Sequence, residues 1–154
     1  MSKKLSGVIA SNKKAFFNFE IVDTLECGIV LTGYEVKSLR RGNMSLQDAF
    51  IRVDKGELWM IGGYIAPFLQ GGQFQEVNYR RNRKLLAHKK EILKLYSKVQ
   101  EKGVTLVPTR VYFKQNKVKL EVGLAKSKKQ HDKRRVIKER EQKREIDRAR
   151  KNHY

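Results

Sequence analysis

The sequence predicts a mainly β protein: a small antiparallel barrel with packed α-helices and a basic C-terminal tail. Between residues 16 and 124, short segments of alternating apolar and polar residues recur between turn residues, which is typical of antiparallel strands. One longer segment, residues 83–102, spaces its apolar residues as a helix does. Few apolar residues follow position 125. Several short strands with one intervening helix indicate a small barrel, and an OB-like barrel fits, although other small barrels fit this pattern too.

The first strands and a short helix are expected before residue 43. Residues 16–31 alternate as a strand does, and Cys27-Gly28 interrupts the alternation, so we expect two strands joined there as a hairpin. Within residues 34–40, apolar side chains stand three positions apart. This spacing predicts a short helix that ends at Gly42.

A hairpin and the long helix are expected in the middle of the chain. Residues 46–53 and 58–65 have strand-like patterns, and Gly56 between them supplies the positive φ that a tight turn requires. The apolar stripe over residues 83–102 has lysines opposite it and is followed by Gly103, a typical residue after the end of a helix. This segment is therefore predicted to form one long helix.

The last two strands are expected over residues 104–113 and 118–124, with a turn at 115–117. Pro108 indicates an edge position or a bulge in the first of them, because proline cannot donate a hydrogen bond to a neighbouring strand.

The chain is expected to comprise a flexible basic arm (residues 1–11), a barrel domain (12–125) and a basic tail (126–154). The tail holds 13 Lys and Arg against 5 Asp and Glu. Its acid-to-base pairs at i,i+4, such as Glu139 and Lys143, each contribute only about 0.2–0.5 kcal/mol to helix stability. Without an apolar stripe, such a helix is marginal in water. We therefore expect the tail to be mostly disordered alone and helical against a partner.

The net charge of +19 indicates a polyanionic partner, with nucleic acid as the leading candidate. A membrane partner is not expected, because the sequence lacks the strongly amphipathic basic helix or the lipidation motif that would anchor it to a membrane surface. No apolar run approaches the length of a membrane span, and the N-terminus does not resemble a signal peptide. With one cysteine, Cys27, the chain fits a reducing compartment, so we expect a cytoplasmic protein.

The sequence offers no convincing catalytic, metal or cofactor site, so we expect no enzyme, no cofactor and no small-molecule substrate. Its three histidines are far apart, and Cys27 has no second thiol beside it for a metal site. Glu26 and Glu35 are the only pair worth weighing as nuclease carboxylates. We interpret them instead as a surface acid and a helix-face acid, since nuclease carboxylates cluster around a metal.

Two clusters point toward RNA. The cations among residues 80–84 are expected at the start of the long helix, where they oppose the helix dipole and a phosphate would favour them. Asn12-Lys13-Lys14 lies beside Phe16-Phe17, and basic and aromatic residues occur together in proteins that stack RNA bases. A core position is favoured for the two phenylalanines, however, and also for Trp59.

The motifs, taken in order, resemble the SsrA-binding protein (SmpB) family over about residues 12–144. The segments that carry the resemblance are Asn12-Lys-Lys-Ala15, Glu26-Cys-Gly-Ile-Val-Leu-Thr-Gly33, Glu35-Val-Lys-Ser-Leu-Arg40, Ile65-Ala-Pro67, Arg81-Asn-Arg-Lys-Leu-Leu86, Gly103-Val-Thr-Leu-Val-Pro108 and Lys126-Ser-Lys-Lys-Gln-His-Asp-Lys-Arg134. The chain departs from the family at a few positions. Ser127 stands where Gly is usual, and if that position requires positive φ, serine costs roughly 1 kcal/mol there. Phe19 replaces a usual Tyr, and Gln142 a frequent Trp.

The resemblance implies an OB-like RNA-binding barrel that holds the tRNA-like domain of transfer-messenger RNA (tmRNA) as a monomer in a 1:1 complex. The protein would stand in for an anticodon arm on stalled ribosomes during trans-translation. The residues expected at or supporting the RNA surface are Asn12, Lys13, Lys14, Phe19, Glu26, Arg81, Arg83, Lys84, Leu86 and His88. Those expected at the decoding centre and in the empty mRNA channel are Lys126, Lys128, Lys129, His131, Asp132, Lys133, Arg134, Lys138 and Arg140.

Two other binding functions stay open: a general single-strand-binding OB protein and a ribosome-associated structural protein.

Overall fold

The computed structural model describes residues 7–67, 78–128 and 130–152. The elements in this part of the chain are, in order, β1 (Gly7–Ser11), α1 (Lys13–Asn18), β2 (Phe19–Ile29), α2 (Gly33–Arg40), β3 (Met44–Ser45), β4 (Phe50–Asp54), β5 (Glu57–Ile61), β6 (Tyr64–Ile65), β7 (Arg83–Leu86), α3 (Lys89–Val99), β8 (Val104–Lys114), β9 (Lys117–Ser127) and α4 (Gln130–Asn152).

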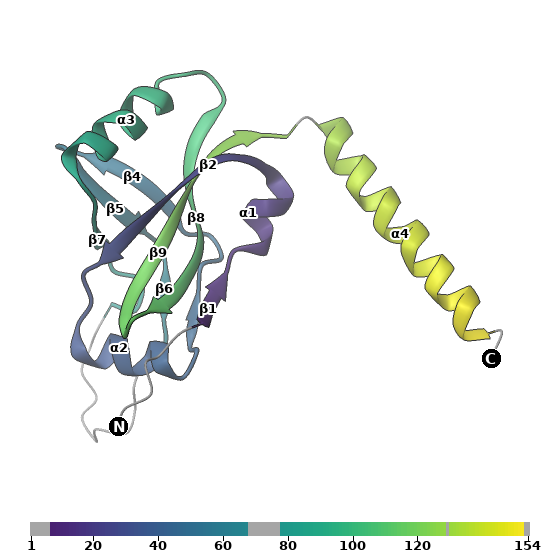
Figure 1. The fold of residues 1–154 in the computed structure, drawn as a ribbon, viewed down its shortest axis with the longest axis horizontal. Coiled ribbons are helices and arrows are strands. Elements are labelled where there is room, and N and C mark those ends of the chain that lie inside the picture. Colours follow the sequence, from purple (N-terminus) through teal and green to yellow (C-terminus); the bar gives the residue numbers. More distant parts are fainter. Residues whose placement is uncertain (1–6, 68–77, 129, 153–154) are drawn as a thin grey trace.

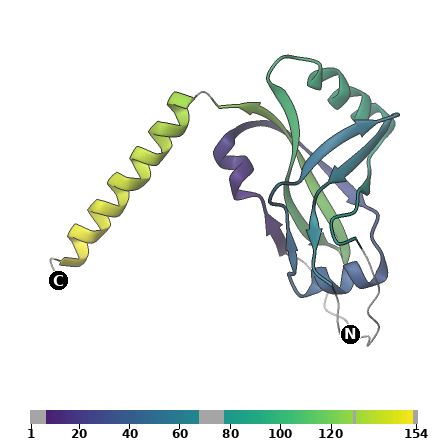
Figure 2. The same cartoon turned by 180° about the vertical axis from the view of Figure 1, so that it is seen from behind.

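Seven strands form one antiparallel sheet in the order β1-β8-β9-β2-β7-β5-β4. β4, at one edge, contacts β8 near the other edge, so the sheet curls round on itself (Figure 1). Helix α2 lies at one end of this barrel and α3 at the opposite end (Figures 1 and 2). The predicted mainly β fold, an antiparallel barrel with packed helices, is confirmed.

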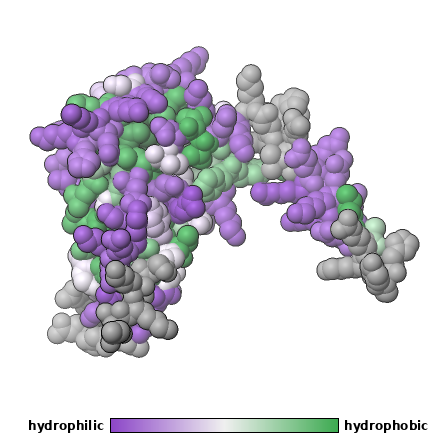
Figure 3. All heavy atoms as spheres, viewed as in Figure 1, coloured by the Kyte–Doolittle hydropathy of each residue, from purple (hydrophilic) through white to green (hydrophobic). Residues whose placement is uncertain are grey.

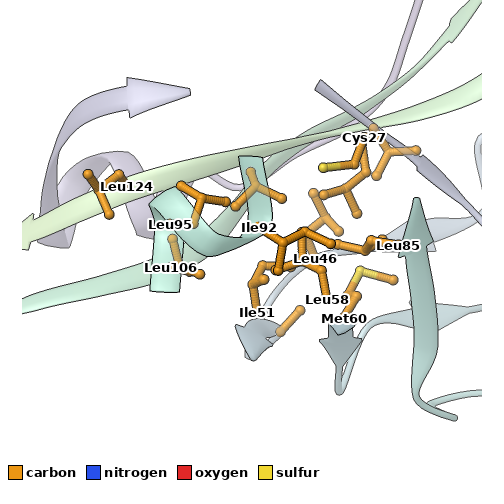
Figure 4. Packing of buried hydrophobic residues seen from close by; sticks show 14 residues of the cluster. Cys27, Leu46, Ile51, Leu58, Met60, Leu85, Ile92, Leu95, Leu106 and Leu124 are labelled. Carbon is orange, nitrogen blue, oxygen red and sulfur yellow. The ribbon is translucent and has the colours of Figure 1, made fainter. Parts of the chain in front are cut away.

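The barrel interior is filled by residues that alternate along the strands, with α3 adding Ile92 and Leu95 (Figure 4). On β5, Leu58 and Met60 are fully buried, because both point inward at period two. Trp59 stands between them and is only half-buried. The favoured core position for Trp59 is therefore wrong: its side chain is on the outer side of the sheet.

The predicted hairpin at Cys27-Gly28 is wrong. Residues 13–18 form α1, and β2 runs without a turn through Cys27 and Gly28, paired with β9 on one side and β7 on the other. Gly28 allows the side chain of Leu86 on β7 to approach closely, since a Cβ at Gly28 would lie 3.3 Å from the Leu86 Cβ. The glycine thus marks a close approach between strands and not a turn.

The predicted helix over residues 83–102 is correct only in its second part. Residues 83–86 form β7, which lies between β2 and β5 in the sheet, and α3 begins after His88. Leu85 is buried among the barrel residues as part of that strand.

The flexible arm predicted over residues 1–11 is wrong for residues 7–11, which form β1 and pair with β8. Residues 1–6 lie outside the described part of the chain.

The turn at Lys55-Gly56 is confirmed, with φ values of 50° and 74°, although the flanking strands are shorter than predicted. The final hairpin is confirmed, and its register shifts next to Pro108 as expected.

Strand β9 continues to Ser127, past the boundary predicted at residue 126, and α4 begins at Gln130. Ser127 pairs with Phe19 in the sheet and is not among the described residues with positive φ. The cost expected for a serine at this position therefore does not arise.

Helix α4 extends away from the barrel, and its surface in Figure 3 is mostly hydrophilic. Disorder of this segment in the absence of a partner stays a prediction. No helix in the described ranges is long and apolar enough to cross a membrane.

Candidate nucleic-acid interface

A buried ion-pair cluster lies beneath the loop that leads into β7. The Arg83 side chain is fully buried and donates from Nε to Glu35 Oε2 at 2.7 Å and from Nη1 to the Gly63 carbonyl at 2.6 Å. Arg81 donates to the other carboxylate oxygen of Glu35. Glu35 is 1% exposed and also accepts from the Thr32 amide at 2.9 Å, which closes the capping box of α2.

The cluster places two of the predicted residues. Arg83 is interior and presents no side-chain surface to a ligand, so of the two positions expected for it, at or supporting the RNA surface, only the supporting one fits. Glu35 lies on α2, as interpreted for a helix-face acid, and its side chain is buried. Arg81, with 31% of its side chain exposed, remains partly accessible beside them.

The electrostatics of the cluster keep both partners charged. Burial raises the pKa of Glu35, but the hydrogen bonds from Arg81, the Thr32 amide and Arg83 outweigh it and leave the pKa below its usual value. Burial lowers the pKa of Arg83, and the hydrogen bond with Glu35 opposes that effect. Guanidinium groups stay protonated in proteins, so the pair is an ionised one.

Strand β7 presents two predicted RNA residues on the outer side of the sheet. Because Arg83 and Leu85 point inward, Lys84 and Leu86 point outward, and Leu86 is 53% exposed. Lys84 lies 3.3 Å from Glu57 and opposite Trp59 in the register. The structure therefore adds Trp59 to this surface.

His88 immediately precedes α3 and is exposed, beyond the end of β7. It follows the exposed Leu86 by two residues. This is compatible with the expected surface position.

A second polar group surrounds Glu26 on β2. Tyr112 donates a hydrogen bond to Glu26, and Lys114 Nζ lies 3.3 Å from the same carboxylate. The Tyr112 hydrogen bond, followed by that of Lys114, leaves the pKa of Glu26 below its usual value despite partial burial. Burial, followed by the bond to Glu26, raises the pKa of Tyr112. Glu26 thus stays an anion among cations near neutral pH.

Sequence reasoning missed the partners of Glu26. Arg110, Tyr112 and Lys114 alternate with buried residues along β8, so one face of that strand carries all three. Arg110 donates to Glu121 on β9 at 2.9 Å, which extends the polar group across the sheet. The period-two pattern of the strand predicted over residues 104–113 is the signal that could have identified this polar face.

Asn12 acts as a structural support for α1. Its Oδ1 accepts from the Ala15 amide at 3.1 Å, and its Nδ2 donates to the Pro108 carbonyl at 2.9 Å. With 7% of its surface exposed, Asn12 fixes α1 on β8 and leaves the following lysines exposed. Lys13 and Lys14 are thereby held at the surface.

The aromatic residues around α1 divide into exposed and packed ones. Phe16 is 43% exposed and Phe17 is half-buried, so their favoured core position is wrong. Phe19 packs against the small buried cluster of Ala15, Val107 and Ala125. Phe19 therefore joins the barrel to α1, with only part of its ring accessible.

The tail residues differ in how far the structure describes them. Lys126 is exposed near the end of β9, and Lys128 donates from Nζ to the Phe16 carbonyl at 3.1 Å. On α4, Lys138 is exposed, and Arg140 lies over the Phe17 ring with its Cζ 5.7 Å from the ring centroid. Lys129 lies outside the described residues.

The remaining tail residues predicted for the decoding centre lie in the first turns of α4, where only the backbone is described: His131, Asp132, Lys133 and Arg134. Asp132 is the third residue of the helix.

Within the described ranges, no group of three His, Cys, Asp or Glu side chains could hold a metal ion. Glu26 and Glu35 each have separate partners, which supports their interpretation as something other than a catalytic pair.

Comparisons with known proteins show the family to which the chain is similar. The family model described as SmpB protein matches residues 9–152. The SsrA-binding protein of Persephonella marina is 53% identical over 139 residues, covering 90% of this chain and 91% of the relative. That of Sulfurihydrogenibium sp. is 52% identical over 149 residues, covering 97% and 95%.

A solved structure is also similar. A chain from the work described as "tmRNA-SmpB: a journey to the center of the bacterial ribosome" matches with a TM-score of 0.66 and 45% identity. The match covers 78% of this chain and 84% of the solved one.

Proposed function

The chain belongs to the SmpB protein family, and from this membership we propose that it binds tmRNA and delivers it to stalled ribosomes for trans-translation. The observation that carries the proposal is the 45% identity, over most of the fold, with a chain from a tmRNA-SmpB structure on the ribosome. The protein acts by binding, with the barrel in the place of an anticodon arm. A role at the ribosome implies a cytoplasmic protein.

The barrel, residues 7–128, is the proposed RNA-holding unit, because β1 and the whole of β9 are parts of its sheet. Its RNA face includes Lys84 and Leu86 on β7, with Trp59 beside them. Exposed cations and an aromatic ring suit the backbone and unstacked bases of a folded RNA. Arg83 and Glu35 support this face from below.

Residues 130–152 are proposed to enter the decoding centre and the empty mRNA channel. The exposed side chains of α4 are mostly charged, so they can meet ribosomal phosphates, and an mRNA already in the channel would exclude the helix. Selection then depends on steric access and not on a message sequence.

A truncation after Lys128 tests the division of labour. The cut keeps β9 whole, whereas a cut after Leu124 would remove residues that pair with β2 and β8. We expect the truncated chain to bind the tRNA-like domain of tmRNA as the full chain does and to fail in peptide tagging on stalled ribosomes. Tagging at the full-chain rate would contradict the proposed tail role.

Sequencing the RNA that co-purifies with the full chain tests the ligand itself. One dominant tRNA-like species is expected. A broad mixture of unstructured RNA would favour a general single-strand-binding protein instead.

A pair of leucine variants tests the proposed RNA face. Leu86→Ala is expected to weaken binding to the tRNA-like domain, and Leu93→Ala on α3 is a matched control, since Leu93 is also exposed, at 62%. Equal affinities of the two variants for the tRNA-like domain would contradict an RNA surface on β7.

A further inference from the structure

The outer face of α3 carries an exposed apolar pair. Helix α3 lies at the end of the barrel opposite α2 (Figure 1), and its Ile92 and Leu95 belong to the core. On its other side, Leu93 and Tyr96 are 62% and 48% exposed. Leu93 has the largest exposed fraction of the large apolar side chains in the described ranges. The barrel therefore leaves this pair uncovered.

The helical repeat makes the two side chains neighbours. Residues three positions apart lie one above the other on a helix surface, and Tyr96 follows Leu93 by three. Two apolar side chains in successive turns form a short ridge, and such a ridge fits into the groove between the side chains of a second helix. We call Leu93 and Tyr96 the α3 ridge.

Lysines flank the α3 ridge. Lys89 and Lys90 precede Leu93 by four and three residues, and Lys94 directly follows it, so all three lie on the exposed side of the helix. None of their ammonium groups takes part in an ion pair or hydrogen bond with another described residue. The acid of this helix, Glu91, is half-buried. The ridge is therefore bordered by positive charge that the protein itself does not neutralise.

We propose that the α3 ridge is a docking site for a protein partner, an amphipathic helix with acidic flanks. The apolar stripe of this helix would cover the α3 ridge, and its carboxylates would pair with the lysines on either side. An apolar centre that includes an aromatic ring, within a charged rim, is the arrangement of protein interfaces. Two anchor residues make a small contact, so the complex is expected to be weak and transient.

Charge excludes the two occupants that this chain could itself supply. Residues 129–154, which include α4, hold 11 Lys and Arg against 5 Asp and Glu, and a second copy of the chain carries a net charge of +19. Either one would bring further cations against the unpaired lysines of α3, and like charges at an interface are unfavourable. The partner therefore has to be acidic.

The apolar ridge favours an acidic protein over an RNA. Phosphates would satisfy the lysines but leave Leu93 in water, because unpaired bases stack on aromatic rings or guanidinium planes and a leucine offers neither. The aliphatic stripe of a helix can cover Leu93 and Tyr96 together. This inference goes beyond the proposed function and does not depend on it, since the α3 ridge is separate from the RNA face proposed on β7.

The test uses the full chain and a fluorescein-labelled peptide of about 18 residues, with leucines along one helical face and glutamates beside them. A shuffled peptide of the same composition lacks the stripe. We expect the striped peptide to bind more tightly than the shuffled one. Leu93→Gln should weaken its binding by about 5- to 30-fold, the loss typical of an interface hot spot. Glutamine has nearly the helix propensity of leucine, so α3 stays intact.

Charge and position each have a matched control. Lys90→Gln combined with Lys94→Gln should weaken binding of the striped peptide, because two flanking charges are lost. Lys117→Gln combined with Lys143→Gln removes two exposed lysines elsewhere and should not weaken it. Val8→Gln on β1 is the control for the leucine variant, since Val8 is 58% exposed. Thermal unfolding of each variant verifies folding, and amide chemical shifts show which element the peptide contacts.

Equal binding of the striped and shuffled peptides overturns the proposal, as does wild-type affinity in Leu93→Gln. An equal loss in the control variants, or chemical-shift changes confined to elements other than α3, also overturns it. A single-stranded RNA tests the other class of partner: if Leu93→Gln weakens RNA and peptide binding equally, α3 is an RNA surface and the protein partner is wrong. Failure of the wild-type chain to select tmRNA overturns the proposed function alone, because the peptide result does not depend on it.

Discussion

Glu35 and Arg83 form an ion pair whose two side chains are both buried. The pairs Lys14–Asp48, Lys84–Glu57, Arg110–Glu121 and Lys114–Glu26 are partly exposed. Arg83 also donates to the carbonyls of Gly63 and Tyr79, so one guanidinium joins α2 to two separate loops. Such a pair contributes less to stability than its charges suggest, because desolvation opposes the attraction. Removing only one of the two partners is costly nonetheless, because the other charge then stays buried without a counter-charge.

Glu35→Gln is expected to lower the free energy of unfolding by about 3–5 kcal/mol, because Arg83 then stays buried without its counter-charge. Urea unfolding at neutral pH measures the change. The matched control is Glu57→Gln, which breaks the exposed pair with Lys84 and should cost less than about 1 kcal/mol. Similar losses in the two variants would contradict the structural role of the buried pair.

The same variant should change the acid dependence of stability. Since the pKa of Glu35 lies below its usual 4.5 in the folded protein, its stabilisation is present above that value and is lost as the pH falls through the folded pKa. The stability of the wild-type chain should therefore decrease more steeply below about pH 4 than that of Glu35→Gln.

Cys27 is expected to make the stability of the protein depend on pH in the alkaline range, as Glu35 does in the acid range. Burial, followed by the nearby Glu91 and Glu26, raises the pKa of this thiol from 9.0 to about 12. The neutral thiol is thus favoured by folding, so its contribution is complete below about pH 9 and is lost as the pH rises toward 12. Between these values, wild-type stability should decrease by up to about 1.4 kcal/mol per pH unit more than that of Cys27→Ala.

Chemical unfolding of the wild-type chain and of Cys27→Ala between pH 8 and 11 would measure this slope. The lysines titrate in both chains, so their contribution cancels in the comparison. Parallel slopes would mean that the thiol ionises in the folded state as readily as in the unfolded one.

Single residues were predictable where strand periodicity is clear. The sequence left Arg83 open between the RNA surface and its support because its cationic neighbours indicate a surface, although it shares the inward parity of Leu85. Trp59 was misplaced for the opposite reason: its apolar ring suggests a core, but its parity is outward. The buried partner of Arg83, Glu35, lies 48 residues away, a separation that local spacing cannot bridge.

At the scale of the elements, strand pairing decided what the local patterns left open. Leu85 and Ile92 are seven residues apart, which satisfies a helix, but Leu85 belongs to a strand between β2 and β5. Cys27-Gly28 looked like a turn, but both residues pair along β2. In both places the partner strand lies far along the chain, and the sequence of the segment itself does not reveal it.

The β8–β9 pair contains a close contact that can be tested. A Cβ at Gly123 would lie 2.7 Å from Thr109 Cγ2, and Thr109 is fully buried with its hydroxyl bonded to Glu121. A β-branched side chain fixed in this way cannot move aside easily. Gly123→Ala should therefore lower the free energy of unfolding by about 1–3 kcal/mol.

Gly63→Ala is the control for this prediction. A Cβ there would also meet an atom at 2.7 Å, but that atom is the terminal methyl of Met60, a flexible side chain. Thermal or urea unfolding should show a smaller loss for Gly63→Ala than for Gly123→Ala. The reverse order would mean that the Met60 packing is the more rigid of the two.

At the scale of the whole molecule, the excess charge is divided between a folded barrel and an extended helix. Residues 129–154 hold 11 Lys and Arg and 5 Asp and Glu, so the segment carries a formal charge of +6 of the total +19. The barrel is therefore basic in its own right. The charge of each part can be tested against each proposed partner.

Binding across a salt series should separate the two parts. Each phosphate contact that is lost reduces the slope of log K against log salt by about 0.9 for a double helix. Truncation after Lys128 should leave the slope for the tRNA-like domain unchanged, because the barrel makes those contacts. With stalled ribosomes the slope should decrease by several such steps, since the tail cations no longer meet ribosomal phosphates.

The full chain with each partner is the reference, and filter binding with labelled RNA or ribosomes supplies the affinities. An equal loss of slope with both partners would indicate that the tail is a general polycation that assists any RNA contact. A loss confined to the ribosome requires instead that the tail acts at a different surface from the barrel, as the direction of α4 away from the sheet suggests.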